Sequence, residues 1–562
     1  MKKFFILSFL FLNTIVFSQS WQWIKRGGSE ADPDINTSRE TITAMETDSQ
    51  GNVFMVAPVN EYAIDVSGNP KTGYGNRDNV ISSFSCDGTY RWSTVVGAYG
   101  NDYIYDLKVD SMGDVYVVMF IQWPNNQFEE LFHFDATTTL PFSETFENRK
   151  RLYIAKYSGT TGNVIWFQSP QIDGLTNYSQ GVLSNLDIDA ENNLYILASL
   201  DPGTYCNGAL VNSTPGNRKY ILKYNNNGGF ISASQPIEFS GSIPFFKRNP
   251  VNGKFYITNY FTNLLGATYS DSDTLRALAC FSPNGTFEWM KSVQNSQPAS
   301  LDIRNLQIDV FGNLYITGHA VIGGTFDSYT ISSTVLAVYP FLLKLNPDGN
   351  VIWGTNATIT PANNNFTYVG INNNNEVVVS PYFHSITWGG SLPNNGSNGG
   401  QDASLWRFNK TTGAFIDNTR LTSSNGYTES VTAITSDIHN NFYVGGYFQG
   451  NIIANSTTLN SVGGSSDFFV AKYGSSDCTL SVEEQQEQNK TMVYPNPAYE
   501  TVFINIKEQS NFSIYNVMGK KVASGIVENA QQPIPISNLA KGSYIIQIKN
   551  SLGTSQSKFI KN

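Results

Sequence analysis

One pattern recurs seven times between Ile42 and Tyr443: an apolar alternating run, a turn that starts with Asp or Asn, and a second β-rich run. The copies read DSQGNVFMV, DSMGDVYVV, AENNLYILA, NPVNGKFYI, DVFGNLYIT, NNNNEVVVS and DIHNNFYVG. They follow one another at intervals of 60 to 79 residues when the third copy is counted from Asp189, the residue before its string. Short alternating runs are typical of β-strands, and this period suits one four-stranded sheet per copy. The sequence therefore predicts an all-β fold, a seven-bladed β-propeller.

The Asp or Asn that opens each turn can accept backbone N–H groups, and the Gly or Asn that follows tolerates the positive φ of a tight hairpin. A calcium loop would need oxygen ligands at several alternating positions and an acidic terminator. The segments after these Asp residues supply at most one further acid. We expect the turns to be structural.

A second hairpin ends in Trp in several copies, but the last copy, DFFVAKYG, stops after its third strand. The N-terminal segment Trp21-Gln22-Trp23-Ile24 repeats the apolar-x-Trp pattern found at Trp92, Trp166, Trp289 and Trp353. We therefore expect this segment to complete the seventh sheet and close the ring, which removes exposed sheet edges. Because these Trp residues recur with the architecture, packing between neighbouring sheets explains them better than one ligand site.

Charge limits the partners. The net charge is −10, but residues 492 to 562 hold seven Lys and three Glu, which leaves −14 for the remainder. An acidic body disfavours nucleic acid and anionic membranes, and leaves neutral glycans, cations and other proteins open. Aromatic residues make up 13% and charged residues 14% of the chain, as in extracellular all-β proteins.

The first residues predict a signal peptide over 1–18, because Lys2 and Lys3 precede an apolar stretch and small residues precede a cut near Gln19. No later run is long enough for a transmembrane segment. The four cysteines have neither metal-site nor redox-site spacing. A disulfide between Cys86 and Cys478, at third-strand ends of adjacent sheets, is left open.

Composition divides the mature chain into three parts. Residues 20–474 carry the repeats, residues 475–491 are polar without alternation and are expected to form a linker, and residues 492–562 return to short alternating runs. The last part predicts a small Ig-like β-sandwich.

The last part resembles a known family. Its motifs YPNP, FSIYNVMGKKV, LAKGSYIIQI and the terminal KFIKN resemble the C-terminal sorting domain of the Bacteroidetes type IX secretion system, through Tyr494, Pro495, Asn496, Pro497, Gly519, Gly542 and Tyr544. The resemblance implies Sec export, recognition by an outer-membrane translocon, and usually removal of the tail near the linker. The cargo would be secreted or attached to the outer cell surface through lipopolysaccharide. The body resembles bacterial secreted propeller repeats through DFFVAKY and its relatives, which implies no settled activity.

Catalytic signatures are missing. The four His residues have no metal spacing, and the sequence has neither a GxSxG elbow nor a phosphate loop, so we expect no catalytic residues, metal or cofactor. Variable recognition chemistry fits the longer connections, which gives five candidate binding residues: Trp123, His133, His319, His384 and Trp388. The sequence favours an exported binding or adhesion module with a glycan or protein ligand. The alternative is a secreted polysaccharide-degrading enzyme with paired carboxylates on the loop-rich face.

Overall fold

The computed structural model is all-β, as the alternating runs predict. It describes residues 19–29, 40–60, 62–65, 67–122, 131–141, 150–171, 181–235, 237, 240–261, 276–293, 302–332, 338–358, 367–382, 385–389, 394–395, 402–424, 426–462, 466–474, 493–504, 509–516, 520–529, 532–550 and 553–562. The chain divides into two compact units, Met1–Asp477 and Cys478–Asn562. No helix among these residues is long and apolar enough to span a membrane.

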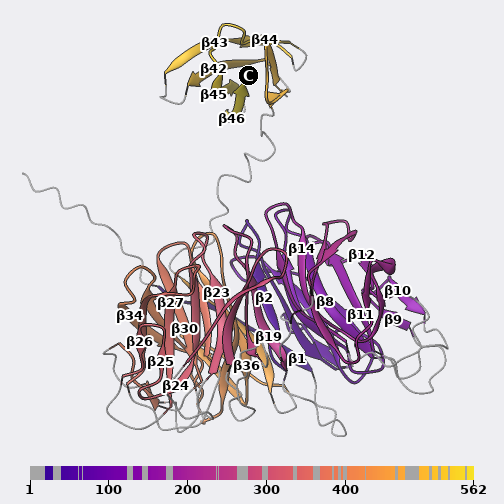
Figure 1. Ribbon diagram of the computed structural model, residues 1–562, viewed down its shortest axis with the longest axis vertical. Coiled ribbons are helices and arrows are strands. Elements are labelled where there is room, and N and C mark those ends of the chain that lie inside the picture. Colours follow the sequence, from indigo (N-terminus) through magenta and orange to yellow (C-terminus); the bar gives the residue numbers. More distant parts are fainter. Residues whose placement is uncertain are drawn as a thin grey trace, which may run out of the picture. The chain divides into compact units, whose positions relative to one another are not determined.

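In the described residues of the first unit, seven antiparallel sheets follow one another along the chain, each with four main strands (Figure 1). The first three sheets are, in spatial order, β2 (Ala44–Thr47), β3 (Val53–Val59), β5 (Asp78–Phe84) and β6 (Tyr90–Val96); β7 (Tyr103–Val109), β8 (Val115–Gln122), β11 (Lys150–Tyr157) and β12 (Val164–Gln168); and β13 (Val182–Ile188), β14 (Leu194–Leu200), β17 (Arg218–Tyr224) and β18 (Phe230–Ala233).

The next three sheets are β19 (Ser240–Arg248), β20 (Phe255–Tyr260), β21 (Arg276–Phe281) and β22 (Phe287–Ser292); β23 (Asp302–Ile308), β24 (Leu314–Val321), β27 (Val338–Leu345) and β28 (Val351–Asn356); and β29 (Thr367–Ile371), β30 (Glu376–Pro381), β33 (Ser404–Asn409) and β34 (Phe415–Arg420). The seventh contains β35 (Glu429–Ser436), β36 (Phe442–Phe448), β39 (Asp467–Gly474) and β1 (Ser20–Ser29), with the short β4 (Ala63–Ile64) beyond it.

Short elements decorate the connections between these strands. They are the pairs β9 (Leu131–His133) with β10 (Thr139–Pro141), β15 (Gly203–Tyr205) with β16 (Leu210–Asn212), β25 (Thr325–Phe326) with β26 (Tyr329–Thr330), β31 (Ser385–Ile386) with β32 (Asn394–Asn395) and β37 (Asn451–Ala454) with β38 (Thr457–Asn460), and the 3-10 turn η2 (Cys206–Gly208).

The first strands of the sheets contact one another in a cycle. Strand β2 contacts β7, and the contacts continue through β13, β19, β23 and β29 to β35, which contacts β2 again. A cluster of buried apolar side chains fills each of the seven junctions between successive sheets, including the junction of the seventh with the first. The arrangement is propeller-like, with the core divided among the junctions rather than gathered at one centre.

The N-terminal strand lies in the last sheet. Strand β1 pairs antiparallel with β39, with Trp21 opposite Tyr473 and Ile24 opposite Ala471. The seventh copy of the repeat therefore obtains its fourth strand from the start of the described chain, more than 400 residues away in sequence.

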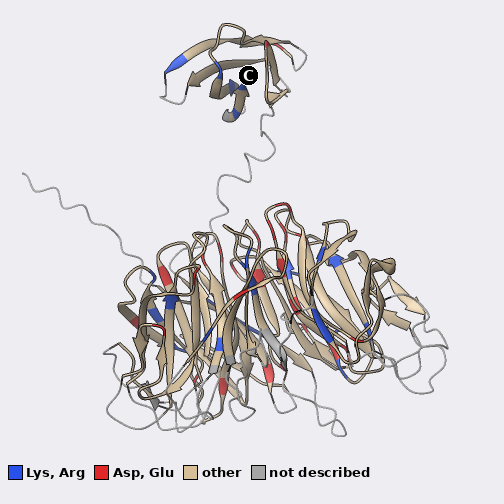
Figure 2. Cartoon of the chain, viewed as in Figure 1, with Lys and Arg blue, Asp and Glu red and all other residues tan. Residues whose placement is uncertain are grey.

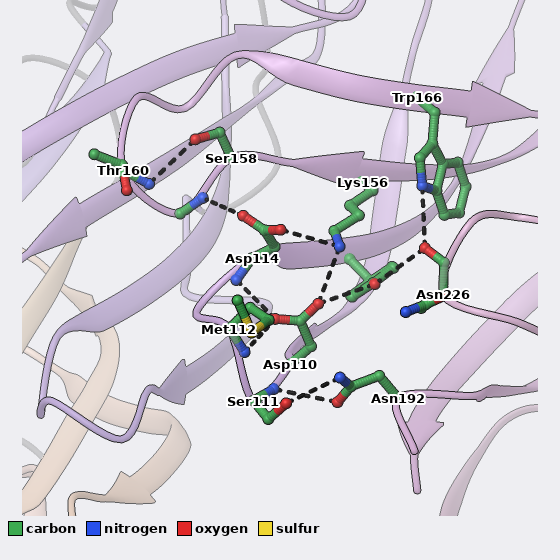
Figure 3. A network of polar contacts seen from close by, with 12 residues as sticks. Asp110, Ser111, Met112, Asp114, Lys156, Ser158, Thr160, Trp166, Asn192 and Asn226 are labelled. Carbon is green, nitrogen blue, oxygen red and sulfur yellow. Dashed lines mark hydrogen bonds and ion pairs between the residues drawn. The ribbon is translucent and has the colours of Figure 1, made fainter. Parts of the chain in front are cut away.

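The turn residues use their side chains within the turns. At Asp110, one carboxylate oxygen accepts the N–H groups of Met112 and Asp114, each at 2.9 Å, and the other accepts the Tyr116 hydroxyl at 3.0 Å and contacts the Lys156 ammonium at 3.1 Å (Figure 3). The same pattern recurs at Asp189, Asp309 and Asp437. These carboxylates already have partners within the fold, as expected for turns with a structural role.

The recurrent Trp residues pack against the next sheet. Each indole lies under the hairpin of the following sheet, at a Gly whose φ lies between 72° and 83° and where an added Cβ would meet the ring more closely than ordinary contact allows. The pairs are Trp23 with Gly88, Trp92 with Gly162, Trp166 with Gly228, Trp289 with Gly349 and Trp353 with Gly413. Since Trp23 belongs to β1 and Gly88 to the first sheet, the same contact recurs at the junction that closes the cycle.

The cysteines follow two patterns. Cys206 and Cys280 are free and buried. Cys86 is disulfide-bonded and buried near the Lys472 ammonium, which lies 3.2 Å from its sulfur. The sequence leaves open a disulfide between Cys86 and Cys478, and Cys478 lies outside the described residues.

The second unit contains two small sheets. One has β40 (Val493–Tyr494), β41 (Thr501–Ile504) and β44 (Ile534–Pro535), and the other has β43 (Lys521–Val527), β42 (Ser510–Asn516), β45 (Gly542–Asn550) and β46 (Gly553–Lys561) in that order. A separate apolar cluster that includes Val502, Ile514 and Ile546 joins them.

Candidate ligand-binding cavity

The first strands of the seven sheets surround a cavity of about 760 Å³. Every one of these strands contributes to its lining. Because the copies are in register, positions counted back from the turn residue fall at the same height in each sheet. In all seven copies, the residue four positions before the turn is the cross-strand partner of the residue eight or nine positions after the turn.

The residues four positions before the turn form the mixed ring. Its seven members all line the cavity: Ala44, Asp106, Asn185, Phe245, Asn305, Tyr368 and Ala433. Their chemistry is uneven around the ring. Polar groups come from the second, third and fifth sheets, aromatic rings from the fourth and sixth, and two small alanines from the seventh and first.

The residues two positions before the turn form the charged ring: Glu46, Lys108, Asp187, Lys247, Gln307, Gly370 and Thr435. All except Asp187 are among the lining residues. Four successive sheets thus present acid, base, acid and base, and the Glu46 carboxylate forms an ion pair with Lys108. Burial and the nearby Lys247 ammonium lower the pKa of Lys108, whereas the Asp187 carboxylate acts in the opposite direction. The whole lining holds three carboxylates, from Glu46, Asp106 and Asp309, and three ammonium groups, from Lys108, Lys247 and Lys410, so its formal charges cancel.

In four of the sheets a backbone irregularity comes directly before the mixed-ring position. In β7, β13, β23 and β35 the pairing register shifts at the residue just before the mixed-ring position, which marks a β-bulge. A bulge adds one residue to one strand and redirects the neighbouring side chains. The same bulge in four sheets therefore belongs to the repeat, while the side chain it presents differs from sheet to sheet.

Some acidic groups in the two rings also join adjacent sheets. Asp106 accepts the backbone N–H of Leu186 at 2.9 Å, and Asp187 accepts that of Arg248 at 2.7 Å. Burial raises the pKa of Asp106 to about 6, against the opposing effects of Lys247 and of the backbone hydrogen bonds from Leu186 and Leu107. Asp106 is therefore a structural acceptor as well as a lining group.

Two lining amides keep unused acceptors. The Oδ1 atoms of Asn185 and Asn305 are buried and have no hydrogen-bond partner among the described residues. Asn305 is only 7% exposed. A buried polar atom without a partner costs about 1–3 kcal/mol, so such atoms in a cavity wall indicate where a ligand's donors would be favourable.

Of the five residues predicted to bind a ligand, the three described ones, His133, His319 and Trp388, are not among the lining residues of the cavity. Trp123 and His384 fall outside the described residues. Trp388 is completely buried and packs on Trp406 and Phe408, and His319 is buried in β24.

His133, in β9, stacks on Tyr74 with ring centroids 3.8 Å apart, and burial lowers its pKa. The described members of this set come from different parts of the body and do not form one site. Their role in binding stays a prediction.

Charged side chains of both signs are scattered among many uncharged residues in the described part of the chain (Figure 2). Among these residues, no group of three or more His, Cys, Asp and Glu side chains is arranged to hold a metal ion. The cavity brings together polar and aromatic groups from separate sheets.

The sorting motifs are tied together in the second unit. The Asn496 side chain accepts the N–H of Ile560 at 2.9 Å and donates to the Lys558 carbonyl at 3.2 Å, which connects the YPNP segment to β46. Both Xaa-Pro bonds of this segment, Tyr494–Pro495 and Asn496–Pro497, are cis. The Tyr544 hydroxyl donates to the Ala540 carbonyl at 2.8 Å. Gly542 has open space at its Cα, and Gly519 lies outside the described residues.

Residues 492–562 match the family described as the secretion system C-terminal sorting domain. The tail is therefore a type IX secretion sorting domain, as its motifs predicted, and the chain is exported to the cell surface or the extracellular space. The comparison with curated proteins found no match.

Solved structures similar to this chain include a quinohemoprotein alcohol dehydrogenase from Comamonas testosteroni, at 11% identity and a TM-score of 0.35, with 86% of this chain and 80% of that chain covered. BamB from Moraxella catarrhalis is similar at 11% identity and a TM-score of 0.30, with 81% and 100% covered. A polysaccharide lyase described as an ulvan lyase is similar at 9% identity and a TM-score of 0.36, with 73% and 92% covered. At these values the likenesses carry no conclusion about activity.

Proposed function

We propose that the exported body is a closed seven-bladed propeller that acts as a binding module, with its ligand held in the central cavity, and that the sorting domain is an Ig-like sandwich. The cycle of first strands and the pairing of β1 with β39 support the closed ring. For the domain boundaries we propose those that composition predicts: residues 20–474 for the propeller, 475–491 for the linker and 492–562 for the sorting domain.

The observation that carries the binding function is the mixed ring. Seven copies of one repeat present seven side chains at one height, and these differ in size, polarity and hydrogen-bonding capacity. Packing alone would be satisfied by the same apolar residue in each copy. A cavity with convergent polar and aromatic groups is the usual form of a small-ligand site.

The carboxylates in the cavity are relevant to the alternative function, a polysaccharide-degrading enzyme with paired carboxylates. Asp106, whose pKa is raised to about 6, and Glu46 are the acidic groups that would serve as acid and nucleophile in sugar hydrolysis. Asp106, however, accepts backbone hydrogen bonds from Leu107 and Leu186, and Glu46 forms an ion pair with Lys108. These contacts favour a binding module over a hydrolase.

A substitution that fills the cavity with a large side chain tests whether the ligand binds there. The full chain and its Ala433→Trp variant would be titrated with neutral, uronate-containing and sulfated oligosaccharides and with short peptides, while chromatography follows any cleavage. We expect binding by the wild type without product, and loss of binding in the variant at unchanged circular dichroism. Released sugar would refute the binding module, and equal binding by both proteins would refute the cavity as its site.

A further inference from the structure

The charge balance and unused acceptors of the cavity indicate the class of ligand. We infer that the cavity takes an uncharged polyhydroxylated ligand, in chemical terms a neutral sugar unit or a polyol. This inference rests on the proposed binding function and adds the chemistry of the bound molecule to it.

The first step concerns charge. The cavity lining holds three carboxylates, from Glu46, Asp106 and Asp309, and three ammonium groups, from Lys108, Lys247 and Lys410. The Glu46–Lys108 ion pair of the charged ring lies among them. A ligand that carries a charge would have to be desolvated beside groups that already neutralise one another, so its own charge would lack a compensating partner. An uncharged ligand avoids this cost. The ring therefore selects against uronates, sulfates and cations.

The second step concerns hydrogen bonds. The Oδ1 atoms of Asn185 and Asn305 need donors, and both residues occupy mixed-ring positions on strands that carry the same bulge. A hydroxyl group supplies a donor without charge and can turn to suit the acceptor. A polyol with several hydroxyls could satisfy both acceptors, which an apolar ligand of equal size could not do.

The third step concerns shape. The aromatic side chains Phe245 and Tyr368 line other parts of the same ring, and Ala44 and Ala433, from adjacent sheets, leave one side of it without bulk. Sugar rings combine apolar C–H faces with polar edges, and aromatic side chains with an apolar face suit that combination. The mixed ring thus offers aromatic surface, hydrogen-bond acceptors and space at one height.

Calorimetric titration of the full chain would use two sets of probes of equal length: neutral gluco-, manno- and galacto-oligosaccharides, and galacturonate or sulfated galactan oligosaccharides. We expect at least one neutral probe to bind and the charged set to bind at least tenfold more weakly. Asn305→Ala should weaken the neutral probe about tenfold, the effect of about one hydrogen bond. Asn163→Ala, at an exposed turn outside the cavity, should leave its affinity unchanged.

The outcomes separate the two levels of inference. Tighter binding of a charged probe, with loss of that binding in Ala433→Trp, would refute the neutral ligand while retaining the cavity as the site. Binding of a neutral probe that neither Asn305→Ala nor Ala433→Trp weakens would refute both. Matching urea-unfolding curves for the variants and the wild type ensure that lost binding does not reflect lost folding.

Discussion

A buried carboxyl group beside the N-terminal strand makes the stability of the body depend on pH. Glu40 is only 7% exposed and accepts the N–H of Ser29 at 2.8 Å. The buried Asp467 belongs to the neighbouring strand, and both carboxylates come within 2.6 and 2.8 Å of the point where a Cβ on Gly28 would lie. Arg26 contacts Asp467 at 3.3 Å, and Arg77 is the other nearby cation.

Burial, with a smaller effect from Asp467, raises the pKa of Glu40 to about 8, although the Ser29 hydrogen bonds and Arg77 oppose the shift. A carboxyl group with a raised pKa in the folded state keeps its proton there, while the unfolded chain releases it above about pH 4.5. Stability then falls as pH rises from about 4.5 to about 8. With about 1.4 kcal/mol for each pH unit, Glu40 alone removes about 2 kcal/mol between pH 6 and pH 8.

The same arrangement recurs at two adjacent junctions. Asp78 faces Asp102 between the first and second sheets, and Asp402 faces Glu429 between the sixth and seventh. Burial raises the pKa of Glu429 to about 9 and that of Asp102 well above its ordinary value. The whole body should therefore lose more stability with rising pH than Glu40 alone accounts for, and a single substitution is needed to isolate one group.

Glu40→Gln keeps an acceptor for Ser29 but cannot ionise. Urea unfolding followed by Trp fluorescence reports on the body alone, because all nine Trp residues precede residue 407. We expect the variant to be more stable than the wild type at pH 8, and its advantage to grow by about 2 kcal/mol from pH 6 to pH 8. The exposed Glu191→Gln should stay within about 0.5 kcal/mol of the wild type throughout.

Parallel pH profiles of Glu40→Gln and the wild type would refute the reasoning, because the buried carboxyl would then not be protonated in the folded state. A variant that is less stable than the wild type at pH 8 would refute it as well, since it would mean that the negative charge contributes favourable contacts.

Three further predictions concern the fold and the tail. Trp23→Ala should lower the free energy of unfolding of the body by about 3–5 kcal/mol. The neighbouring Gln22→Ala should lower it by less than about 1 kcal/mol. Equal losses in the two variants would contradict the role of the Trp23 indole at the junction of the seventh and first sheets. Gly162→Ala places a Cβ against an indole, so in urea unfolding it should destabilise more than Gly68→Ala, which has similar φ but nothing within 4 Å. Asn496→Ala should destabilise the sorting domain by about 1–2 kcal/mol. An immunoblot should then show more uncleaved protein in the cells than for the wild type. Normal export of the variant would contradict a role in sorting for the two hydrogen bonds of Asn496.

Much of the scaffold could be predicted because its contacts are local or repeated. The Asp turns, the packing role of the Trp residues and the placement of β1 beside the last sheet all follow from patterns that return in each copy. The sorting domain was predictable for a different reason, since four ordered motifs recur in its family. In both cases the signal lies in the order of residues along the chain.

The candidate site was missed because long connections were expected to carry it. Trp388 follows β31 in such a connection, yet it is completely buried against Trp406, so apparent loop position did not imply exposure. The buried carboxyl pairs were missed because each joins the third strand of one sheet to the first strand of the next. Sequence spacing gives no distance between such residues.

The repeat itself nevertheless contains the signal for the cavity. Positions where the copies agree, such as the turn Asp and the Tyr six residues later, bond within or between sheets and build the scaffold. Two and four residues before the turn the copies disagree, and all of these residues except Asp187 line the cavity, where no packing rule requires seven equal residues. In a closed repeat fold, disagreement between copies at an inward position is thus the better guide to a ligand site, because selection for packing alone would have made those positions alike.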